Sequence, residues 1–226
     1  MPERNSVWLR PTKNARSQPA LDRDQIVAAA VALLDEETVA GLTMRKLAAR
    51  LDAAPMTLYG YVATKDDLLE FAVDAVFAEA LEDAEPSGEW VADLTAIGRR
   101  TFQALMRHPW AAALVGDNPP MGPAAVAHFA TILRVLTDAG FSDDELGAAT
   151  AGYYYYVLGA ALAESAWARV GESANSWSPE DLSQLTSADG RDVTPTVRFL
   201  GRFAHTDSSQ RFEQGLHCLL NGLHRA

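Results

Sequence analysis

The sequence predicts an all-α protein, with a small N-terminal three-helix domain followed by a larger helical domain. Apolar residues recur with helical spacing along most of the 226 residues. No stretch shows the strict alternation of a half-buried strand, and no repeat interrupts the pattern. With 48% hydrophobic and 22% charged residues, the composition is that of a globular protein with a sizeable core.

The chain shows no sign of secretion or of membrane insertion. Arg4 and Lys13 break up any apolar leader, and the longest apolar run, residues 148–163, is shorter than the ~20 residues that span a bilayer. The single cysteine, Cys218, excludes an internal disulfide and fits a reducing compartment. We therefore expect a cytoplasmic protein without membrane contact.

Charge divides the chain unevenly. Residues 1–65 hold nine Lys and Arg against seven Asp and Glu, a net charge of +2. Residues 66–226 hold ten against 23, a net charge of −13, so the whole chain carries −11. DNA affinity comes largely from cations that neutralise phosphates, so only the first segment suits a nucleic acid.

Proline and helix signals divide the chain into three parts. Residues 1–20 have scattered cations and prolines without a helical period, and we expect a flexible basic arm. Residues 21–67 form the small domain and residues 68–226 the larger one. We expect further helices over 90–107, 109–115, 123–139, 143 to about 170, and 208–223, with a mobile polar loop over 171–194 that holds a short helix after Pro179.

Four helix starts are marked in the small domain. The first helix begins near Asp22, ends at Gly41, and buries Ile26, Val27, Ala30, Leu33 and Leu34. Thr43 caps a second helix, 44–51, and Pro55 begins a third, 55–62. Thr64 caps a fourth, which runs from Lys65 to about Asp83 and leads into the larger domain.

Two short helices joined by a tight turn can place side chains in the major groove of DNA. Arg45 is long enough to bind guanine, and Thr57 can contact a base or a phosphate. Tyr59 and Tyr61 can donate to phosphates, and Lys65 adds a charge. Amphipathic helix pairs also occur in proteins that never bind DNA, so the pattern leaves that alternative open.

The residues of this segment closely resemble the tetracycline-repressor (TetR) family of bacterial regulators. The resemblance rests on GLTMRKLA at 41–48, PMTLYGYV at 55–62 and TKDDL at 64–68. It implies a homodimeric repressor that leaves a palindromic operator when a small molecule binds. It also implies DNA-facing positions at Thr43, Arg45, Pro55, Met56, Thr57, Tyr59, Tyr61 and Lys65.

Three positions depart from the family pattern. Asp52 replaces the usual turn glycine, and Asp tolerates a left-handed backbone better than most residues. Gly60 falls inside the expected recognition helix, where it costs roughly 1 kcal/mol relative to Ala. Tyr61 stands where His is common, which keeps a hydrogen-bonding ring but changes its reach.

The later sequence resembles the C-terminal domain of the branch nearest the tetracycline repressor. There the penultimate long helix and the last helix of two subunits form a four-helix bundle. The small residues Ala151, Gly152, Gly159, Ala160 and Ala163 suit close helix approach. Leu216, Leu219, Leu220 and Leu223 form the matching stripe. Packing within one subunit is the alternative for both sets.

A cavity between helices suits an apolar or aromatic effector. Each candidate side chain is individually more often part of a core than a ligand contact, and at most two of the four consecutive tyrosines 153–156 can face one cavity. The candidates are Phe102, Gln103, Met106, His108, Trp110, Phe129, Tyr154, Tyr155, Trp167 and Trp177. In the tetracycline repressor a His ends the fourth helix, whereas this chain has ALED at 80–83. We therefore expect a largely apolar effector other than magnesium-tetracycline.

Other functions remain as alternatives. The five histidines show no paired metal-ligand spacing, and neither a nucleophile motif nor a glycine-rich phosphate loop is present, so we expect no enzyme activity, metal or cofactor. A helical interaction module that has lost DNA binding, or an activator with the same fold, would share the sequence pattern.

Overall fold

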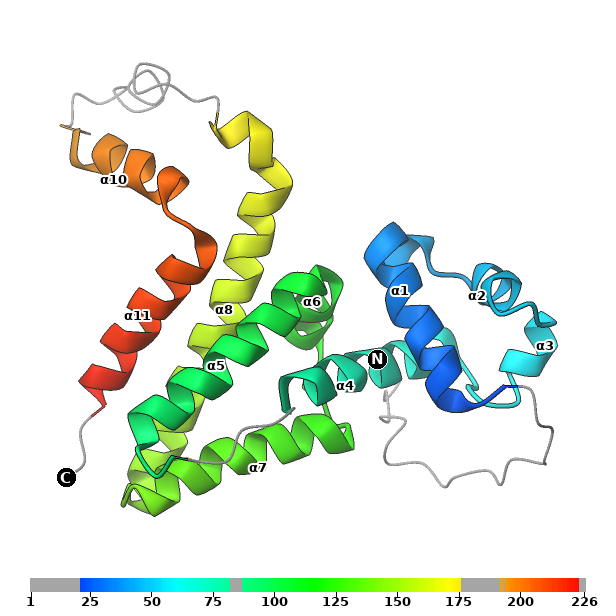
Figure 1. The fold of residues 1–226 in the computed structure, drawn as a ribbon, viewed down its shortest axis with the longest axis horizontal. Coiled ribbons are helices and arrows are strands. Elements are labelled where there is room, and N and C mark those ends of the chain that lie inside the picture. The colour runs from blue at the N-terminus through cyan, green and yellow to red at the C-terminus, as the bar shows by residue number, and fades with distance from the viewer. Residues whose placement is uncertain (1–20, 82–86, 176–191, 193, 224–226) are drawn as a thin grey trace.

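The computed structural model describes residues 21–81, 87–175, 192 and 194–223, and within these ranges every regular element is a helix. In Figure 1, α1 to α3 form a small domain at one end, α4 joins it to the remaining helices, and α10 and α11 lie at the opposite end. The helices are α1 (Arg23–Gly41), α2 (Met44–Arg50), α3 (Pro55–Leu58), α4 (Lys65–Leu81), α5 (Trp90–Arg107), α6 (Pro109–Asp117), α7 (Pro123–Asp138), α8 (Asp143–Asn175), α10 (Thr194–His205) and α11 (Ser208–Gly222).

Three of the four predicted helix starts of the small domain are confirmed by capping bonds, and the fourth, at Pro55, is confirmed by the first residue of α3. Asp22 and Gln25 form a capping box at the start of α1, with the Asp22 carboxylate accepting from the Gln25 N–H at 2.7 Å. The Thr43 hydroxyl accepts from the third N–H of α2 at 3.2 Å, and the Thr64 hydroxyl accepts from Asp67 at 3.0 Å. The five apolar residues expected on the buried face of α1 are all buried.

The third helix is shorter than the sequence predicted. We expected a helix over 55–62, but α3 ends at Leu58. The amides of Tyr61 and Val62 both donate to the Leu58 carbonyl at 2.9 Å, which closes a tight turn in place of a second helical turn. Gly60 therefore lies in this turn and not inside a helix, so the expected penalty of a mid-helix glycine does not arise.

The larger domain agrees with the expected helices except around the polar loop. α8 continues to Asn175, so the first residues of the predicted loop 171–194 are helical. Helix α10, Thr194–His205, was not expected. The arm 1–20 and the short helix expected after Pro179 lie outside the described residues. No helix in the described part of the chain has the length and apolar character needed to cross a membrane.

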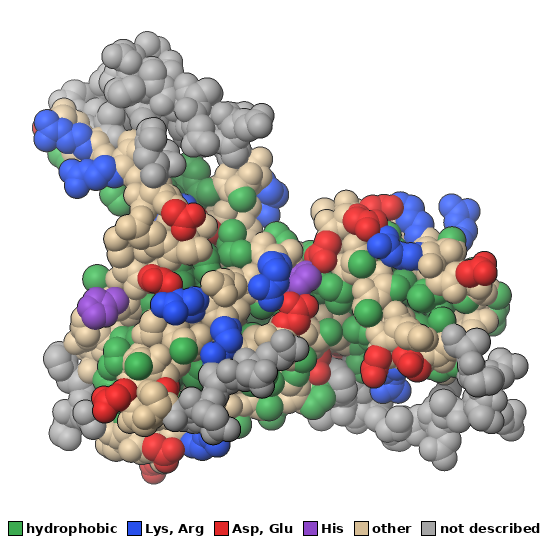
Figure 2. Space-filling view, viewed as in Figure 1, with side chains coloured by type: hydrophobic (Ala, Val, Ile, Leu, Met, Phe, Trp, Pro, Cys, Tyr) green, Lys and Arg blue, Asp and Glu red, His purple; other side chains and the backbone are tan. Residues whose placement is uncertain are grey.

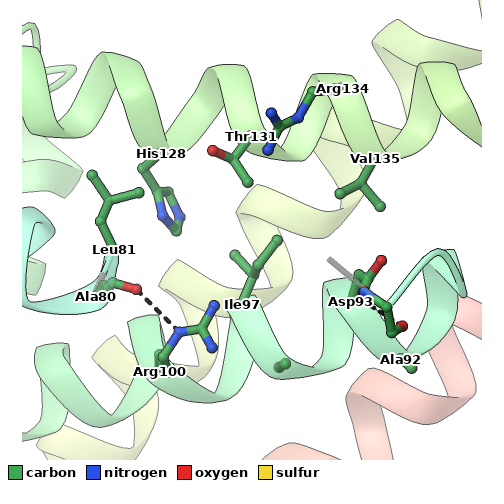
Figure 3. Close-up of a pocket in the computed structure, with 12 residues that line it drawn as sticks. Ala80, Leu81, Ala92, Asp93, Ile97, Arg100, His128, Thr131, Arg134 and Val135 are labelled. Atoms are coloured by element: carbon green, nitrogen blue, oxygen red, sulfur yellow. Dashed lines mark hydrogen bonds between the residues drawn. The ribbon is translucent and has the colours of Figure 1, made fainter. Parts of the chain in front are cut away.

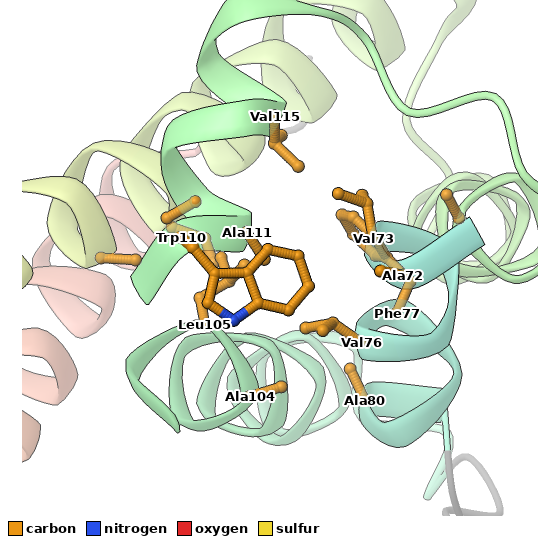
Figure 4. Packing of buried hydrophobic residues seen from close by; sticks show 14 of the residues in the cluster. Ala72, Val73, Val76, Phe77, Ala80, Ala104, Leu105, Trp110, Ala111 and Val115 are labelled. Carbon is orange, nitrogen blue, oxygen red and sulfur yellow. The ribbon is translucent and has the colours of Figure 1, made fainter. Parts of the chain in front are cut away.

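Helix α4 is buried on several sides because it packs against both domains. Leu68, Ala72 and Val76 are almost completely buried, and α4 contacts α1 in the small domain and α5, α6 and α7 in the larger one. Figure 4 shows the Trp110 ring of α6 between α4 and α5, close to Val76. A helix held by apolar contacts on both sides can transmit movement between the two domains.

A buried carboxyl group fixes α4 to the start of α7. Asp74 is 8% exposed and accepts a hydrogen bond from the Ala125 N–H at 2.9 Å. A side chain at Gly122 would collide with this carboxyl group, so glycine is required there for the close approach. Burial raises the pKa of Asp74, and the bonds from the Ala125 and Ala124 amides oppose that shift.

We expect Asp74→Leu to lower the free energy of unfolding by about 2 kcal/mol, because the first amides of α7 lose their buried acceptor. Asp74→Asn keeps a carbonyl oxygen, and burial already disfavours the charge, so this variant should stay within about 1 kcal/mol of wild type. Urea unfolding at pH 7 measures both. A leucine variant as stable as wild type would show that the hydrogen bonds from α7 to Asp74 do not contribute to the free energy of unfolding.

Candidate DNA-binding and effector sites

The small domain exposes most of the side chains that the sequence placed against DNA. Tyr61 and Lys65 are half-buried, and the other six of the eight are exposed. Met56 is 78% exposed and Tyr59 46%. Large apolar and aromatic side chains that are exposed together on a folded domain indicate a binding surface for another molecule. The six exposed residues are Thr43, Arg45, Pro55, Met56, Thr57 and Tyr59.

A small apolar core holds α2 and α3 in place beneath this surface. Leu47, Ala48 and Leu58 are almost completely buried. Asp52 adopts the left-handed conformation expected for the turn, with φ 48°. The Ala53 amide donates to the Ala48 carbonyl at 2.9 Å, which ends α2 and directs the chain toward α3. The exposed side chains of both helices are therefore carried on a fixed turn.

Acidic residues of α1 neutralise much of the positive charge of α2. The Arg50 guanidinium forms two hydrogen bonds to Glu36, at 2.7 and 2.9 Å, and these lower the pKa of Glu36. Lys46 pairs with Glu37. Figure 2 shows Lys and Arg side chains next to Asp and Glu over the small domain. Among the described residues, Arg45 has neither an acidic nor a carbonyl partner, so its charge is available to DNA.

Lys65 is held within the small domain. Its ammonium group donates to the Val39 carbonyl at 2.7 Å, and the side chain is half-buried. The bond joins the start of α4 to the C-terminal end of α1, where helical geometry is interrupted at Thr38, with φ 63°. In this structure Lys65 fixes α4 to α1 and does not extend from the surface.

A polar junction joins α1 to the larger domain. The Asp35 carboxylate of α1 lies 2.8 Å from His108 Nδ1 and accepts from the indole N–H of Trp110 at 2.7 Å. On its other side, His108 Nε2 lies 3.2 Å from Glu79 of α4, which also pairs with Arg107 at 2.8 Å. His108 and Trp110, expected among the effector contacts, are here parts of the contact between domains.

The nine predicted effector contacts that the structure describes do not meet in one cavity. Phe102 is buried and stacks on Phe212 with the ring centroids 4.2 Å apart. Phe102, Gln103 and Met106 line a groove of about 270 Å³ beside α11. The Trp167 ring lies 5.4 Å from Phe203 of α10. Trp177 lies outside the described residues.

The tyrosine run points in four directions, as a helix requires. Tyr153 is buried and donates to the Leu94 carbonyl, and Tyr156 donates to the Phe212 carbonyl, each at 2.7 Å. The Tyr154 ring lies 5.0 Å from Phe129, which is another predicted contact. Tyr155 is 69% exposed.

A cavity of about 360 Å³ lies between the end of α4, α5 and α7. None of the nine predicted contacts within the described residues lines it. Figure 3 shows the side chains that α5 and α7 direct into it from opposite sides. Its apolar lining includes Leu81, Ala92, Ala96, Ile97 and Val135, and its polar lining includes Asp93, Arg100, His128, Thr131 and Arg134.

Helical spacing in the sequence indicates the polar residues that line this cavity, whereas the aromatic residues do not. Asp93, Ile97 and Arg100 share one face of α5 because they are separated by four and three residues. His128, Thr131 and Arg134 follow each other at intervals of three on α7. A polar face on each of two neighbouring helices indicates a lined cavity only when the helices are known to pack together.

His128 sits in this cavity as a neutral side chain at pH 7. It is 3% exposed, and its Nε2 lies 3.3 Å from the Thr101 hydroxyl. Burial lowers the pKa of His128 to about 4, and the nearby Arg100 charge acts in the same direction. An unfolded chain would bind a proton below the ordinary pKa of 6.5. The unfolded state therefore binds more protons between these values, and stability falls as the pH falls through that window.

We expect wild type to lose about 2 kcal/mol more stability between pH 7 and pH 5 than the His128→Gln variant, whose side chain does not titrate. Urea unfolding of both proteins at the two pH values measures this difference. Equal losses in the two proteins would mean that His128 is charged in the folded state or does not contribute to acid sensitivity.

The residues expected at the dimer interface on α8 and α11 fall into an exposed group and a buried group. Gly159 and Ala163 are exposed, and side chains added at Gly152 or Gly159 would meet open space. Tyr155 and Leu162 project from the same face of α8. In the leucine stripe, Leu216 and Leu220 are fully buried against their own chain, so packing within one subunit applies to them. Leu219 and Leu223 are half-buried.

Comparisons with known proteins agree with this arrangement. The family model for bacterial regulatory proteins of the tetR family matches residues 26–72, and that for the tetracyclin repressor-like C-terminal domain matches residues 82–226. An HTH-type transcriptional regulator of Saccharopolyspora erythraea is 44% identical over 162 residues, 72% of this chain and 69% of that protein. The HTH-type transcriptional repressor DrrR1 of Streptomyces coeruleorubidus is 32% identical over 221 residues, 95% of this chain and 80% of that protein.

A solved structure extends the likeness to the whole fold. ActR of Streptomyces coelicolor, in complex with actinorhodin, superimposes with a TM-score of 0.75 at 26% identity, over 91% of this chain and 96% of that one. The matching family model and the two relatives identify a helix-turn-helix transcriptional regulator. The chain belongs to the TetR family of bacterial regulatory proteins.

Proposed function

We propose that the chain is a transcriptional repressor that binds a palindromic operator as a homodimer and is released when an effector enters the larger domain. The observation that carries this proposal is the exposed set on α2, α3 and the following turn. Arg45 supplies an uncommitted cation, and Met56 and Tyr59 supply exposed apolar and aromatic surface. A set of this composition suits one major groove of DNA.

Each exposed residue has a distinct contribution to operator binding. Arg45 can donate to guanine O6 and N7, which is the commonest base-specific contact. Thr43 offers its hydroxyl to a phosphate at the start of α2, where the helix dipole favours negative charge. Thr57 and Met56 can lie against thymine methyl groups, and the Tyr59 hydroxyl can donate to the backbone. Pro55 starts α3 and sets its direction.

Two copies of the small domain would be held together by α8 and α11. One face of α8 carries Gly152, Tyr155, Gly159 and Leu162, of which Tyr155 is 69% and Leu162 36% exposed. Small residues allow a second α8 to approach closely, and Tyr155 would become buried. A two-fold axis through this face requires two half-sites related by the same symmetry, which is why the operator is palindromic.

The effector would act by shifting populations between two dimer shapes. The cavity is bounded by the last turn of α4, and the first turn of α4 is bonded to α1 through Lys65. An effector that binds better when α4 has moved would favour a dimer whose α3 helices are misplaced for successive major grooves. The polar junction of Asp35 and His108 would carry the same movement through α6.

We propose an effector with a largely apolar body, and not magnesium-tetracycline. The stretch 80–83, ALED, corresponds to the end of the fourth helix, where the tetracycline repressor has a histidine, and its Ala80 and Leu81 line the cavity. A rise in melting temperature with tetracycline and magnesium, absent with apolar compounds of similar size, would overturn this assignment. We infer that the chain acts without a catalytic step and that it works in the cytoplasm, where a bacterial regulator meets its operator DNA.

Selection of bound DNA from a random pool tests the repressor proposal. We expect an inverted repeat whose half-sites are centred about one helical turn apart or a small multiple of it. Reporter expression from a promoter that carries the selected site should fall when the protein is present. A pool that shows no enrichment, or enrichment of an unpaired site, would contradict the proposal.

A further inference from the structure

Among the described residues, the lining of the cavity between α4, α5 and α7 has more cationic than anionic side chains, although the protein as a whole is acidic. The chain carries a net charge of −11, yet Arg100 and Arg134 both line this cavity. Figure 3 shows the Arg100 guanidinium extending from α5 toward the carbonyl group of Ala80, and Arg134 on α7 beside Thr131. Two arginines in the lining of one largely apolar cavity are suited to an anion.

The one acidic side chain among the described lining residues is already occupied. Asp93 accepts from the amide and the hydroxyl of Ser87, both at 2.7 Å, and from the Gly88 amide at 3.2 Å. These bonds fix its carboxylate to the segment before α5. These donors are uncharged, so Asp93 keeps its negative charge, but among the described residues no ion pair joins it to Arg100 or Arg134.

Arg100 has donors to spare. Its Nε donates to the Ala80 carbonyl at 3.2 Å, near the C-terminal end of α4. A guanidinium group has five N–H donors, and the edge formed by its two terminal nitrogens matches the two oxygens of a carboxylate. The described residues provide no acidic partner for that edge. Arg100 can therefore hold α4 and an anion at once.

The rest of the lining suits an apolar body. Ile97 and Val135 are each 6% exposed and form the inner wall. His128 contributes an uncharged ring, and Thr131 a hydroxyl group. A volume of about 360 Å³ is that of a small ligand site.

We propose that the effector is a small organic acid, with its anionic group bound by Arg100 and Arg134 and its apolar part packed against Ile97 and Val135. This inference rests on the proposed function, which makes the cavity the effector site. It also gives the site a direct connection to α4, because Arg100 would bind both the anion and the Ala80 carbonyl. Binding of the anion would then change the position of Arg100 and, through the Ala80 carbonyl, the position of α4, which joins the two domains.

A matched pair of fluorescent dyes tests the preference for an anion. Anilinonaphthalene sulfonate and N-phenylnaphthylamine share an aromatic body, and only the first carries a negative charge. We expect the wild-type dimer to bind the sulfonate about tenfold more tightly than the neutral amine, since hydrogen bonds to a charged group are the stronger ones. Arg100→Gln and Arg134→Gln should each weaken sulfonate binding about tenfold and leave binding of the amine within about twofold.

Arg99→Gln is the control for charge outside the cavity. Arg99 is adjacent to Arg100 on α5 but pairs with Glu213 at 2.6 Å on the exposed side. This variant should bind both dyes as wild type does. Equal affinity of wild type for the two dyes, or an equal loss of sulfonate binding in the Arg99 and Arg100 variants, would overturn the proposal.

Operator titration separates this inference from the proposed function. Arg134→Gln lies far from the exposed DNA surface and should bind the selected operator with wild-type affinity when no dye is present. Retention of operator binding together with a preference for the neutral dye would reject the organic acid and leave the repressor proposal intact. Circular dichroism melting confirms that each variant is folded.

Discussion

Replacing both Arg45 and Tyr59 with alanine is expected to weaken operator binding by at least about a hundredfold. A good bidentate arginine–guanine contact is worth about 1–3 kcal/mol, and loss of the Tyr59 phosphate contact adds to it. Neither side chain contributes to the buried core, so the fold should not change. Fluorescence anisotropy with a labelled operator at fixed salt concentration measures the affinity.

Arg50→Ala provides the matched control for this prediction. Arg50 lies on the same helix as Arg45 but is paired twice with Glu36. Its removal should cost much less operator affinity than removal of Arg45. The contradicting result would be a double variant that binds the operator as wild type does, with an unchanged circular dichroism spectrum. The surface on α2 and α3 would then not be the DNA-binding surface. A helical interaction module would become the better interpretation.

The Arg211→Met substitution is expected to cause the largest loss of stability, about 3–5 kcal/mol at pH 7. Arg211 of α11 donates from Nε to Glu164 of α8 at 2.8 Å and also donates to the Phe203 carbonyl at 2.7 Å. Its guanidinium lies 4.2 Å from the centroid of the Phe203 ring. Glu164 is 7% exposed, so its charge would be buried without compensation.

Two further variants separate the cost of the unpaired Glu164 charge from the cost of losing any ion pair. Adding Glu164→Gln to Arg211→Met should restore much of the stability, because no unpaired charge then remains. Breaking the exposed pair of Arg99 and Glu213 should cost at most about 1 kcal/mol. Urea unfolding must be done at one protomer concentration, because a dimer is stabilised by association. A loss below about 1 kcal/mol for Arg211→Met would show that the three helices do not depend on this residue.

The sequence predicted the small domain well because its signals are local. Asp22, Thr43 and Thr64 each cap a helix within three residues of themselves, and the buried face of α1 follows a simple period. The error lay in α3. There the choice between a continued helix and a tight turn at Leu58 depends on how residues 59–62 pack on α2 and α4, which no local pattern reveals.

The effector cavity was not predictable because it depends on contacts between distant residues. His108 and Trp110 look like aromatic ligand contacts in the sequence, but Asp35 lies more than seventy residues away and engages both. Arg100 and His128 come together only because α5 packs against α7. Helix α10 was not predicted because it follows a long polar stretch that the sequence indicates as a loop. In the structure, Phe203 of α10 packs against Trp167 and Arg211.

The stoichiometry of the operator complex tests the central claim most directly. Sedimentation or light scattering of the protein with the selected palindrome should give two chains of 24.4 kDa per operator, and the isolated half-site should bind far more weakly at the same salt concentration. A single chain on the palindrome, or equal affinity for the palindrome and for random DNA, would contradict the account.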